Sequence, residues 1–363
     1  MSFRYSDDED TSYKIRRSAT KTLASVIATR PELLGTLYKS VSPVLISRFG
    51  DREESVRLEI WATYVTLLTQ TGLYGGQAKE TDGSFVGGKR KREEEGEMDV
   101  EETPYTLLRF QVPSLAKTLF KQLQSSKTPP ATLQAGFGLL LALLTVLPGC
   151  LSNQATPIVS TTKFVLSQPP TTATSTLHVT VLSFLALFFA THPSATFNSV
   201  LPSVTPPLLK AVREKHPRIA AEAFRVFSAL LIALRPLRTA DWADGIYDEA
   251  VHRLKANDTD AEVRERAGEL IGDLWVSATD IVKAKGGLEW QALLRPAGRT
   301  TEGPVKVVQR VVSEAEVEDQ WIDGCVEWVA NVLKKSGRAG KIDAFVTLNA
   351  LLSKSAASLC LSL

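Results

Sequence analysis

The residue types that carry most enzyme and metal chemistry are few in this chain and stand apart. The four histidines are His178, His192, His216 and His252, and the three cysteines are Cys150, Cys325 and Cys360. No two of them have the spacing that a zinc site or a redox dithiol needs. We therefore expect no metal site, no cofactor and no disulfide framework, in keeping with a reducing compartment.

The glycines and carboxylates also lack catalytic patterns. The chain has no Gly-x-Ser-x-Gly, no Gly-x-Gly-x-x-Gly and no phosphate-binding loop, and its glycines gather in polar stretches. The carboxylate pair Glu53-Glu54 stands at an expected helix start, where negative charge favours the helix dipole. We predict that the protein is not an enzyme and has no small-molecule substrate.

What the sequence does contain is a recurring phrase: an aspartate followed five residues later by a branched apolar residue and then an arginine. It occurs at Asp10, Asp51 and Asp258, each time ahead of a long amphipathic stretch. An aspartate in the preceding turn can cap a helix and stabilise its positive end. We expect the apolar residue to enter the core and the arginine to bridge to an acidic residue or a neighbouring repeat.

Apolar residues open these stretches at regular intervals. The six anchors are Ile15, Val56, Leu133, Leu177, Ile219 and Val263, with steps of 41, 77, 44, 42 and 44 residues. A proline or glycine follows each of the first five after 15 to 17 residues, at Pro31, Gly72, Pro148, Pro193 and Pro236. Such residues end helices. Steps in the low forties are typical of HEAT or armadillo repeats, at about 40–47 residues per helix pair.

The sequence thus predicts an all-α, HEAT-repeat α-solenoid of about seven helix pairs, in which each repeat is an A helix, a turn and a B helix. The predicted organisation is HEAT repeats over 1–72, a disordered charged insertion over 73–104, repeats over 105–283, an irregular insertion over 284–314 and one further repeat over 315–355. Neither chain end carries a polar capping repeat. We therefore expect an internal piece of a longer solenoid, or a truncated gene model.

The first insertion contains the basic tetrad Lys89, Arg90, Lys91 and Arg92. Its composition is that of a nuclear import signal, although a charge-balanced solvated loop would look the same. The prolines of the A helices, such as Pro43 and Pro113, are expected to kink them.

Composition limits the classes of partner. The net charge is +2 and the pI is about 8.3, which gives no argument for nucleic acid. The longest apolar runs, Phe137–Leu147 and Val181–Phe189, are too short to span a membrane. We expect a protein partner, bound along the B helices that typically line the concave side of such arrays. The candidate interface residues on those helices are Arg17, Lys21, Arg57 and Arg225.

Several segments resemble the cullin-associated, neddylation-dissociated protein family. The more specific ones are Tyr5–Lys21 and Tyr38–Phe49, the latter continued by Arg52–Val56. Shorter matches follow in order at Gln111–Pro113, Val146–Gly149, Arg235–Pro236, Arg253–Ala256 and Glu262–Ala267. The likeness thins beyond residue 284, and the insertion Gly75–Glu102 is longer and more charged than the family pattern.

The resemblance implies a large HEAT solenoid that wraps an unmodified cullin with its RING subunit. It also implies a role in exchanging substrate receptors on cullin–RING ubiquitin ligases, with binding blocked by the ubiquitin-like modifier of the cullin. We expect a non-catalytic, cullin-binding scaffold segment of such an exchange factor, located in cytoplasm and nucleus. The alternative is a HEAT scaffold of nuclear transport or transcription, for which the basic tetrad is the local support.

Overall fold

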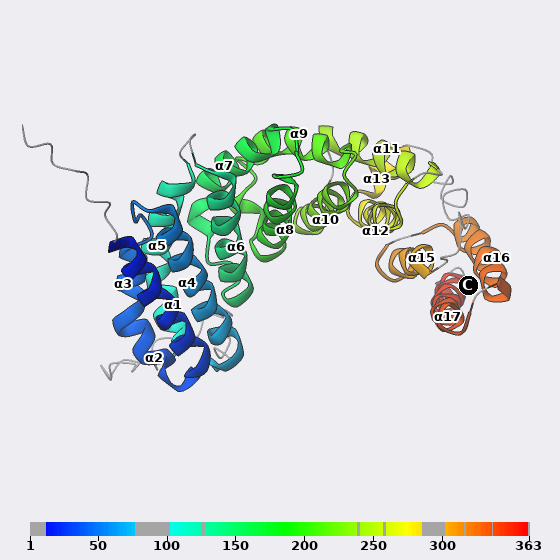
Figure 1. The fold of residues 1–363 in the computed structure, drawn as a ribbon. Coiled ribbons are helices and arrows are strands. Elements are labelled where there is room, and N and C mark those ends of the chain that lie inside the picture. Colours follow the sequence, from blue (N-terminus) through cyan, green and yellow to red (C-terminus); the bar gives the residue numbers. More distant parts are fainter. Residues whose placement is uncertain are drawn as a thin grey trace, which may run out of the picture. The chain divides into compact units, whose positions relative to one another are not determined.

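The computed structural model describes residues 12–76, 102–124, 128–237, 240–256, 259–284, 302–315, 317–335 and 337–361. Within these ranges the chain forms helices and no strand, which confirms the all-α prediction (Figure 1). No described helix is both long and apolar enough to cross a membrane. The chain divides into two compact units, Met1–Pro157 and Ile158–Leu363.

The first unit has two layers of helices. The B helices α1 (Ser12–Thr29), α4 (Glu54–Tyr74) and α6 (Pro130–Val146) pack one against the next. The other layer contains η1 (Pro31–Leu33), α2 (Leu34–Thr36), η2 (Leu37–Val41), α3 (Ser42–Ser47) and α5 (Pro104–Leu123). Between the layers Phe49 meets Tyr64 edge to face, with ring centroids 5.4 Å apart.

The first A helix runs without a gap from Leu34 to Ser47, and the expected irregularity at Pro43 takes the form of a π-turn within it. Pro43 has no N–H to donate to the carbonyl of Lys39, and the chain passes instead through the π-turn η2 into α3. Helix α5, by contrast, continues through Pro113. The start of α5 is capped by Thr103, whose side chain accepts a hydrogen bond from the Thr106 amide at 3.2 Å.

The second unit repeats the same plan. Its B helices α8 (Ser175–Thr191), α10 (Pro217–Ala233), α12 (Ala261–Ser277), α15 (Glu302–Glu314) and α17 (Arg338–Leu361) are successive neighbours. The remaining elements are η3 (Ser152–Gln154) and α7 (Ala155–Ser167) near the boundary of the units, then η4 (Ser194–Thr196), α9 (Leu201–Val212), α11 (Asp241–Lys255), α13 (Thr279–Ala284) and α16 (Asp319–Lys335). The HEAT-type α-solenoid is confirmed as the fold class.

Helix α15 corrects the prediction of irregular chain over 284–314. Gly303 and Pro304 suggested a loop, but they stand in the first turn of the helix, where proline is tolerated. Val307 follows Val263 by 44 residues, which is the ordinary repeat step. It packs closely on α12, since a Cβ placed on Gly272 would lie 3.2 Å from its Cγ1. Residues 285–301 of the predicted irregular insertion lie outside the described residues.

The anchors behave as predicted with one exception. Val56, Leu133, Leu177, Ile219 and Val263 are at most 4% exposed. Ile15 is 72% exposed and does not enter the core, because among the described B helices only α4 packs on α1. Helix α4 also runs past Gly72 to Tyr74, and it ends at Gly75, where a Cβ would lie 2.6 Å from the Thr71 carbonyl oxygen.

Candidate partner-binding surface

The recurring Asp–Arg phrase holds the repeats together at Asp51. The Asp51 carboxylate accepts from the Glu53 amide at 3.0 Å, which fixes the start of α4. It also pairs with Arg16 of α1, whose Nε and Nη2 lie 3.2 and 3.3 Å from its two oxygens. This two-point bridge links neighbouring repeats. Asp10 and Asp258 lie outside the described residues, and Asp260 caps α12 by accepting from the Glu262 amide at 2.9 Å.

Arg57, a candidate interface residue, faces the same turn. Its Nη1 donates to the backbone carbonyl oxygen of Asp51 at 2.9 Å, and the side chain is half-buried. Arg264 makes the corresponding hydrogen bond in the second unit, where its Nη2 donates to the Ala256 carbonyl oxygen at 2.8 Å. Arginine at this place in the repeat therefore closes the turn before a B helix.

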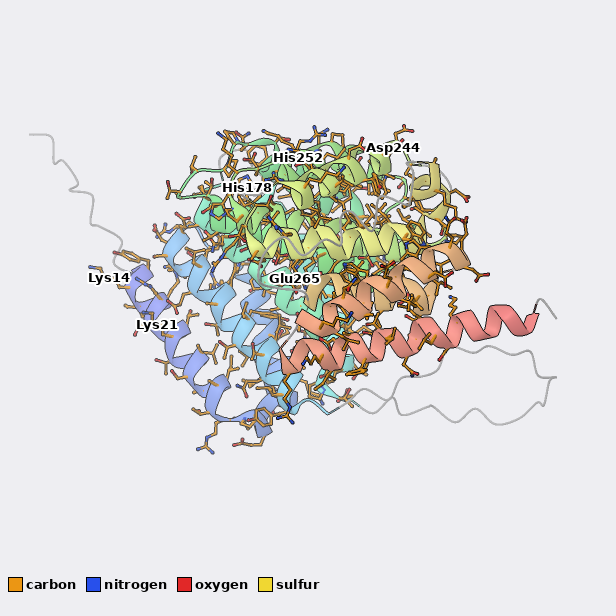
Figure 2. All side chains as sticks on the ribbon, turned by 90° about the vertical axis from the view of Figure 1, so that its right-hand side faces the viewer. Lys14, Lys21, His178, Asp244, His252 and Glu265 are labelled. Carbon is orange, nitrogen blue, oxygen red and sulfur yellow. The ribbon has the colours of Figure 1, made fainter. Side chains whose placement is uncertain are left out.

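Arg17 and Lys21, two further candidates, come together on one carboxylate. Both reach Glu59 of α4, at 3.4 and 3.9 Å, while their side chains stay about half exposed. Figure 2 labels Lys21 together with Lys14, which stands two turns earlier on α1. The outward side of α1 therefore offers cations that a partner can reach without breaking the core.

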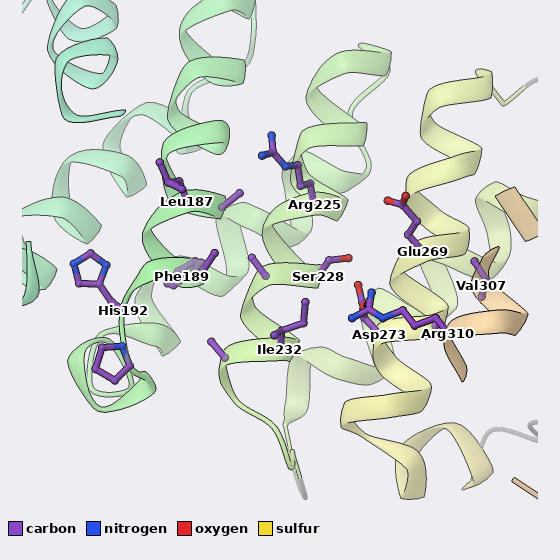
Figure 3. Close-up of a pocket in the computed structure, with 16 residues that line it drawn as sticks. Leu187, Phe189, His192, Arg225, Ser228, Ile232, Glu269, Asp273, Val307 and Arg310 are labelled. Atoms are coloured by element: carbon purple, nitrogen blue, oxygen red, sulfur yellow. Dashed lines mark ion pairs between the residues drawn. The ribbon is translucent and has the colours of Figure 1, made fainter. Parts of the chain in front are cut away.

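Arg225 is brought into a different setting, a groove in the second unit. The groove lies across α8, α10, α12 and α15 and has a volume of about 620 Å³ (Figure 3). Apolar groups such as Phe189, Ala229 and Ile232 line one side. Arg225 pairs with Glu222 at 3.4 Å and remains half exposed. A groove of this size and lining can receive a partner side chain.

The charged side of the groove is formed by Asp273 of α12 and Arg310 of α15, which form an ion pair. Arg310 also lies 3.5 Å from Glu314, and Arg235 lies 3.2 Å from the same carboxylate. Burial raises the pKa of Asp273 to about 6, although its hydrogen bond to Ser228 and the charge of Arg310 both act to lower it. The removal of this carboxylate from water thus outweighs its partners.

Sequence reasoning missed Asp273 and Arg310. Arg310 lies within the span expected to be irregular, so nothing placed it beside α12. Asp273 did carry a signal, because it stands in an apolar run between Ile271 and Leu274 where a core residue is expected. A charged residue at such a position needs a partner.

The described residues contain no group of three His, Cys, Asp or Glu side chains that could hold a metal ion. His192, at the edge of the groove, places Nδ1 2.9 Å from the carbonyl oxygen of Phe188. Burial raises the pKa of both the Cys150 and Cys325 thiols to about 12, which disfavours the nucleophilic thiolate.

Comparisons with known proteins identify relatives of this chain. Residues 149–269 match the family model described as CAND1-like, TPR repeats. The chain is 31% identical over 362 residues to cullin-associated NEDD8-dissociated protein 1 of Dictyostelium discoideum, covering 95% of this chain and 26% of the relative. It is 34% identical over 276 residues to cullin-associated NEDD8-dissociated protein 2 of Rattus norvegicus, covering 74% and 20%. A protein of Emericella nidulans named as the C-terminal part of cullin-associated NEDD8-dissociated protein 1 is 24% identical, with coverages of 96% and 39%.

Solved structures agree on the fold. Kap95p in its complex with RanGDP superimposes with a TM-score of 0.55 at 10% identity, covering 94% of this chain and 46% of that chain. Importin beta superimposes with a TM-score of 0.54 at 13% identity, covering 97% and 46%. At these identities the likeness concerns the stacking of helix pairs and carries no statement about function.

Proposed function

Because the chain belongs to the family of cullin-associated NEDD8-dissociated proteins, as a segment about a quarter as long as its relative from Dictyostelium discoideum, we propose that it is a cullin-binding scaffold. The observation that carries this proposal is the match over 95% of the chain, which runs through both compact units. Relatives named for their association with cullins make a cullin the first partner to test.

The proposed mechanism is binding by many modest contacts along stacked helices. In the first unit the half-exposed Arg17 and Lys21 supply charge, and in the second the groove beside Arg225 can accept a side chain. Specific protein interfaces bury about 1,600 Å² in total, which one groove does not provide but a series of B helices can. The carboxylate and guanidinium groups of the groove form ion pairs with one another, which supports a non-catalytic role.

We propose further that the partner is an unmodified cullin with its RING subunit, and that the chain contributes to exchange of substrate receptors on cullin–RING ligases. The test is a pull-down of the purified chain by immobilised cullin–RING complex, with and without the ubiquitin-like modifier on the cullin. Retention by the unmodified complex alone is expected. Failure of both this chain and a longer protein containing it to be retained by the unmodified complex would refute the proposal.

For location we propose cytoplasm and nucleus, with the tetrad Lys89, Arg90, Lys91 and Arg92 acting as an import signal. These residues lie outside the described ranges, so the support is composition alone. In a fluorescent fusion in which all four residues are alanine, the fraction of the protein found in the nucleus should fall. An unchanged distribution would show that the tetrad is not an import signal. The nuclear-transport alternative would then lose its local support.

A further inference from the structure

Charge is distributed very unevenly along the chain. Between Glu102 and Glu214 there is no aspartate or glutamate. The basic residues of that stretch are Arg109, Lys117, Lys121, Lys127, Lys163, Lys210 and Arg213. The segment Leu33–Gly50 has no acidic residue either. The elements α2, η2, α3 and α5 of the first unit lie within these two stretches and contain no acidic residue, so this layer is basic although the whole chain is almost neutral.

Two basic residues of α5 share one exposed side of the helix with an aromatic residue. Phe110, Ser114, Lys117 and Lys121 are all exposed. They follow one another at steps of four, three and four residues, so they lie above one another along the helix. The opposite side of α5 is the buried one, with Leu108, Val112, Leu115 and Leu119 in the core.

Helix α3 widens this surface. It packs beside α5: the Ser42 hydroxyl hydrogen-bonds to Gln111, and a Cβ on Gly50 would lie 3.0 Å from Nε2 of Gln122. Val44 of α3 is exposed, and so is Arg48, which directly follows the helix. We call the set Val44, Arg48, Phe110, Lys117 and Lys121 the α3–α5 face.

The cations of the α3–α5 face have no carboxylate partner among the described residues, unlike most basic residues around them. At the edge of the layer Lys39 pairs with Glu102, and on α1 Arg17 pairs with Glu59. Phe110 stands among these cations with 78% of its surface exposed, and Val44 is 59% exposed. Aromatic and arginine side chains are the commonest energetic centres of protein interfaces.

We propose that the α3–α5 face binds an acidic protein segment that also carries an apolar side chain. Carboxylates of that segment would meet the cations, and its apolar side chain would cover Phe110 and Val44. A nucleic-acid duplex fits less well, because it presents a charge about every 1.7 Å while the two lysines of α5 on this face are about 6 Å apart along the helix. The face lies on A helices whereas the cullin proposal invokes the B helices, so the inference stands independently of the cullin proposal.

The experiment uses the intact chain and a fluorescein-labelled peptide of glutamates interrupted by leucines, followed by fluorescence anisotropy. Binding should saturate and weaken with salt, and a peptide with lysine in place of glutamate should not bind. The double variant Lys117→Glu and Lys121→Glu should weaken binding at least about tenfold, and Phe110→Ala several-fold. The matched control, Lys215→Glu with Arg218→Glu on exposed positions of the second unit, should bind as the parent does.

Three results would overturn the proposal. The first is peptide binding by the double variant that equals that of the parent, or a loss of peptide binding in the matched control that equals the loss in the double variant. The second is a duplex DNA oligonucleotide that binds as tightly and is lost with the same substitutions, which would indicate a general polyanion site. The third is tighter peptide binding after Glu93→Ala, Glu94→Ala and Glu95→Ala are combined, which would make the chain's own acidic run the occupant. Thermal unfolding of each variant checks that these exposed substitutions leave the fold intact.

Discussion

Replacement of Asp273 by asparagine should remove a pH dependence that this buried carboxyl gives to the second unit. Its pKa rises from 3.8 in water to about 6 in the fold, chiefly through burial. One pKa unit corresponds to about 1.4 kcal/mol, so the shift is equivalent to about 3 kcal/mol. The folded-state pKa is the higher one, so the folded state binds the proton more tightly. Stability from this group is therefore present below pH 4 and is lost as the pH rises through about 6.

The Asp273→Asn variant carries no such ionisation. Its free energy of unfolding should match the parent near pH 4 and exceed it by up to about 3 kcal/mol at pH 7. Arg310 would not be left buried without a partner, because it is partly exposed and lies 3.5 Å from Glu314. Urea unfolding followed by tryptophan fluorescence, repeated between about pH 4 and pH 7, measures the difference. The exposed Asp323→Asn serves as control. A variant less stable than the parent at pH 7 by more than about 1 kcal/mol would show that the ion pair outweighs burial and refute the reasoning.

Three other substitutions test the packing of the repeats. Asp51→Ala removes the acceptor of the Glu53 amide and the partner of Arg16, and should lower the stability of the first unit by about 1–3 kcal/mol in urea unfolding. Gly75→Ala forces a Cβ to 2.6 Å from a backbone carbonyl of α4, so the free energy of unfolding of the first unit should fall by about 1–3 kcal/mol, as is typical of overpacking, and its melting temperature should fall with it. Val308→Ala empties a fully buried position of α15 and should cost about 1–3 kcal/mol, whereas an irregular segment there would tolerate it.

Much of the fold could be predicted because it depends on local periodicity. Anchors one repeat apart, such as Ile219 and Val263, are buried since each B helix turns the same side to its neighbours. Ile15 has the same sequence pattern but is exposed, because burial depends on which helices are present around it. Helix α15 was missed because Pro304 is read as a stop although proline is equally suited to a first turn.

The candidate surface was harder to predict from the sequence. The repeat pattern identifies Arg57, but only coordinates show that its guanidinium closes a turn on the Asp51 carbonyl oxygen. Similarly, Arg17 and Lys21 meet on Glu59 of the neighbouring repeat, a contact that helix periodicity does not determine. The pairing of Asp273 with Arg310 required knowing that α15 packs on α12. Local pattern predicts elements, whereas sites depend on how the elements pack.

The central claim is that this segment itself binds a cullin. Sedimentation velocity of the chain mixed with purified, unmodified cullin–RING complex tests it most directly, because free and bound species are seen together without a surface or tag. We expect a single faster boundary containing both proteins, and a weaker complex when Arg17→Glu and Lys21→Glu are combined on α1. Two boundaries that sediment as the separate proteins do, at every ratio tried, would contradict it.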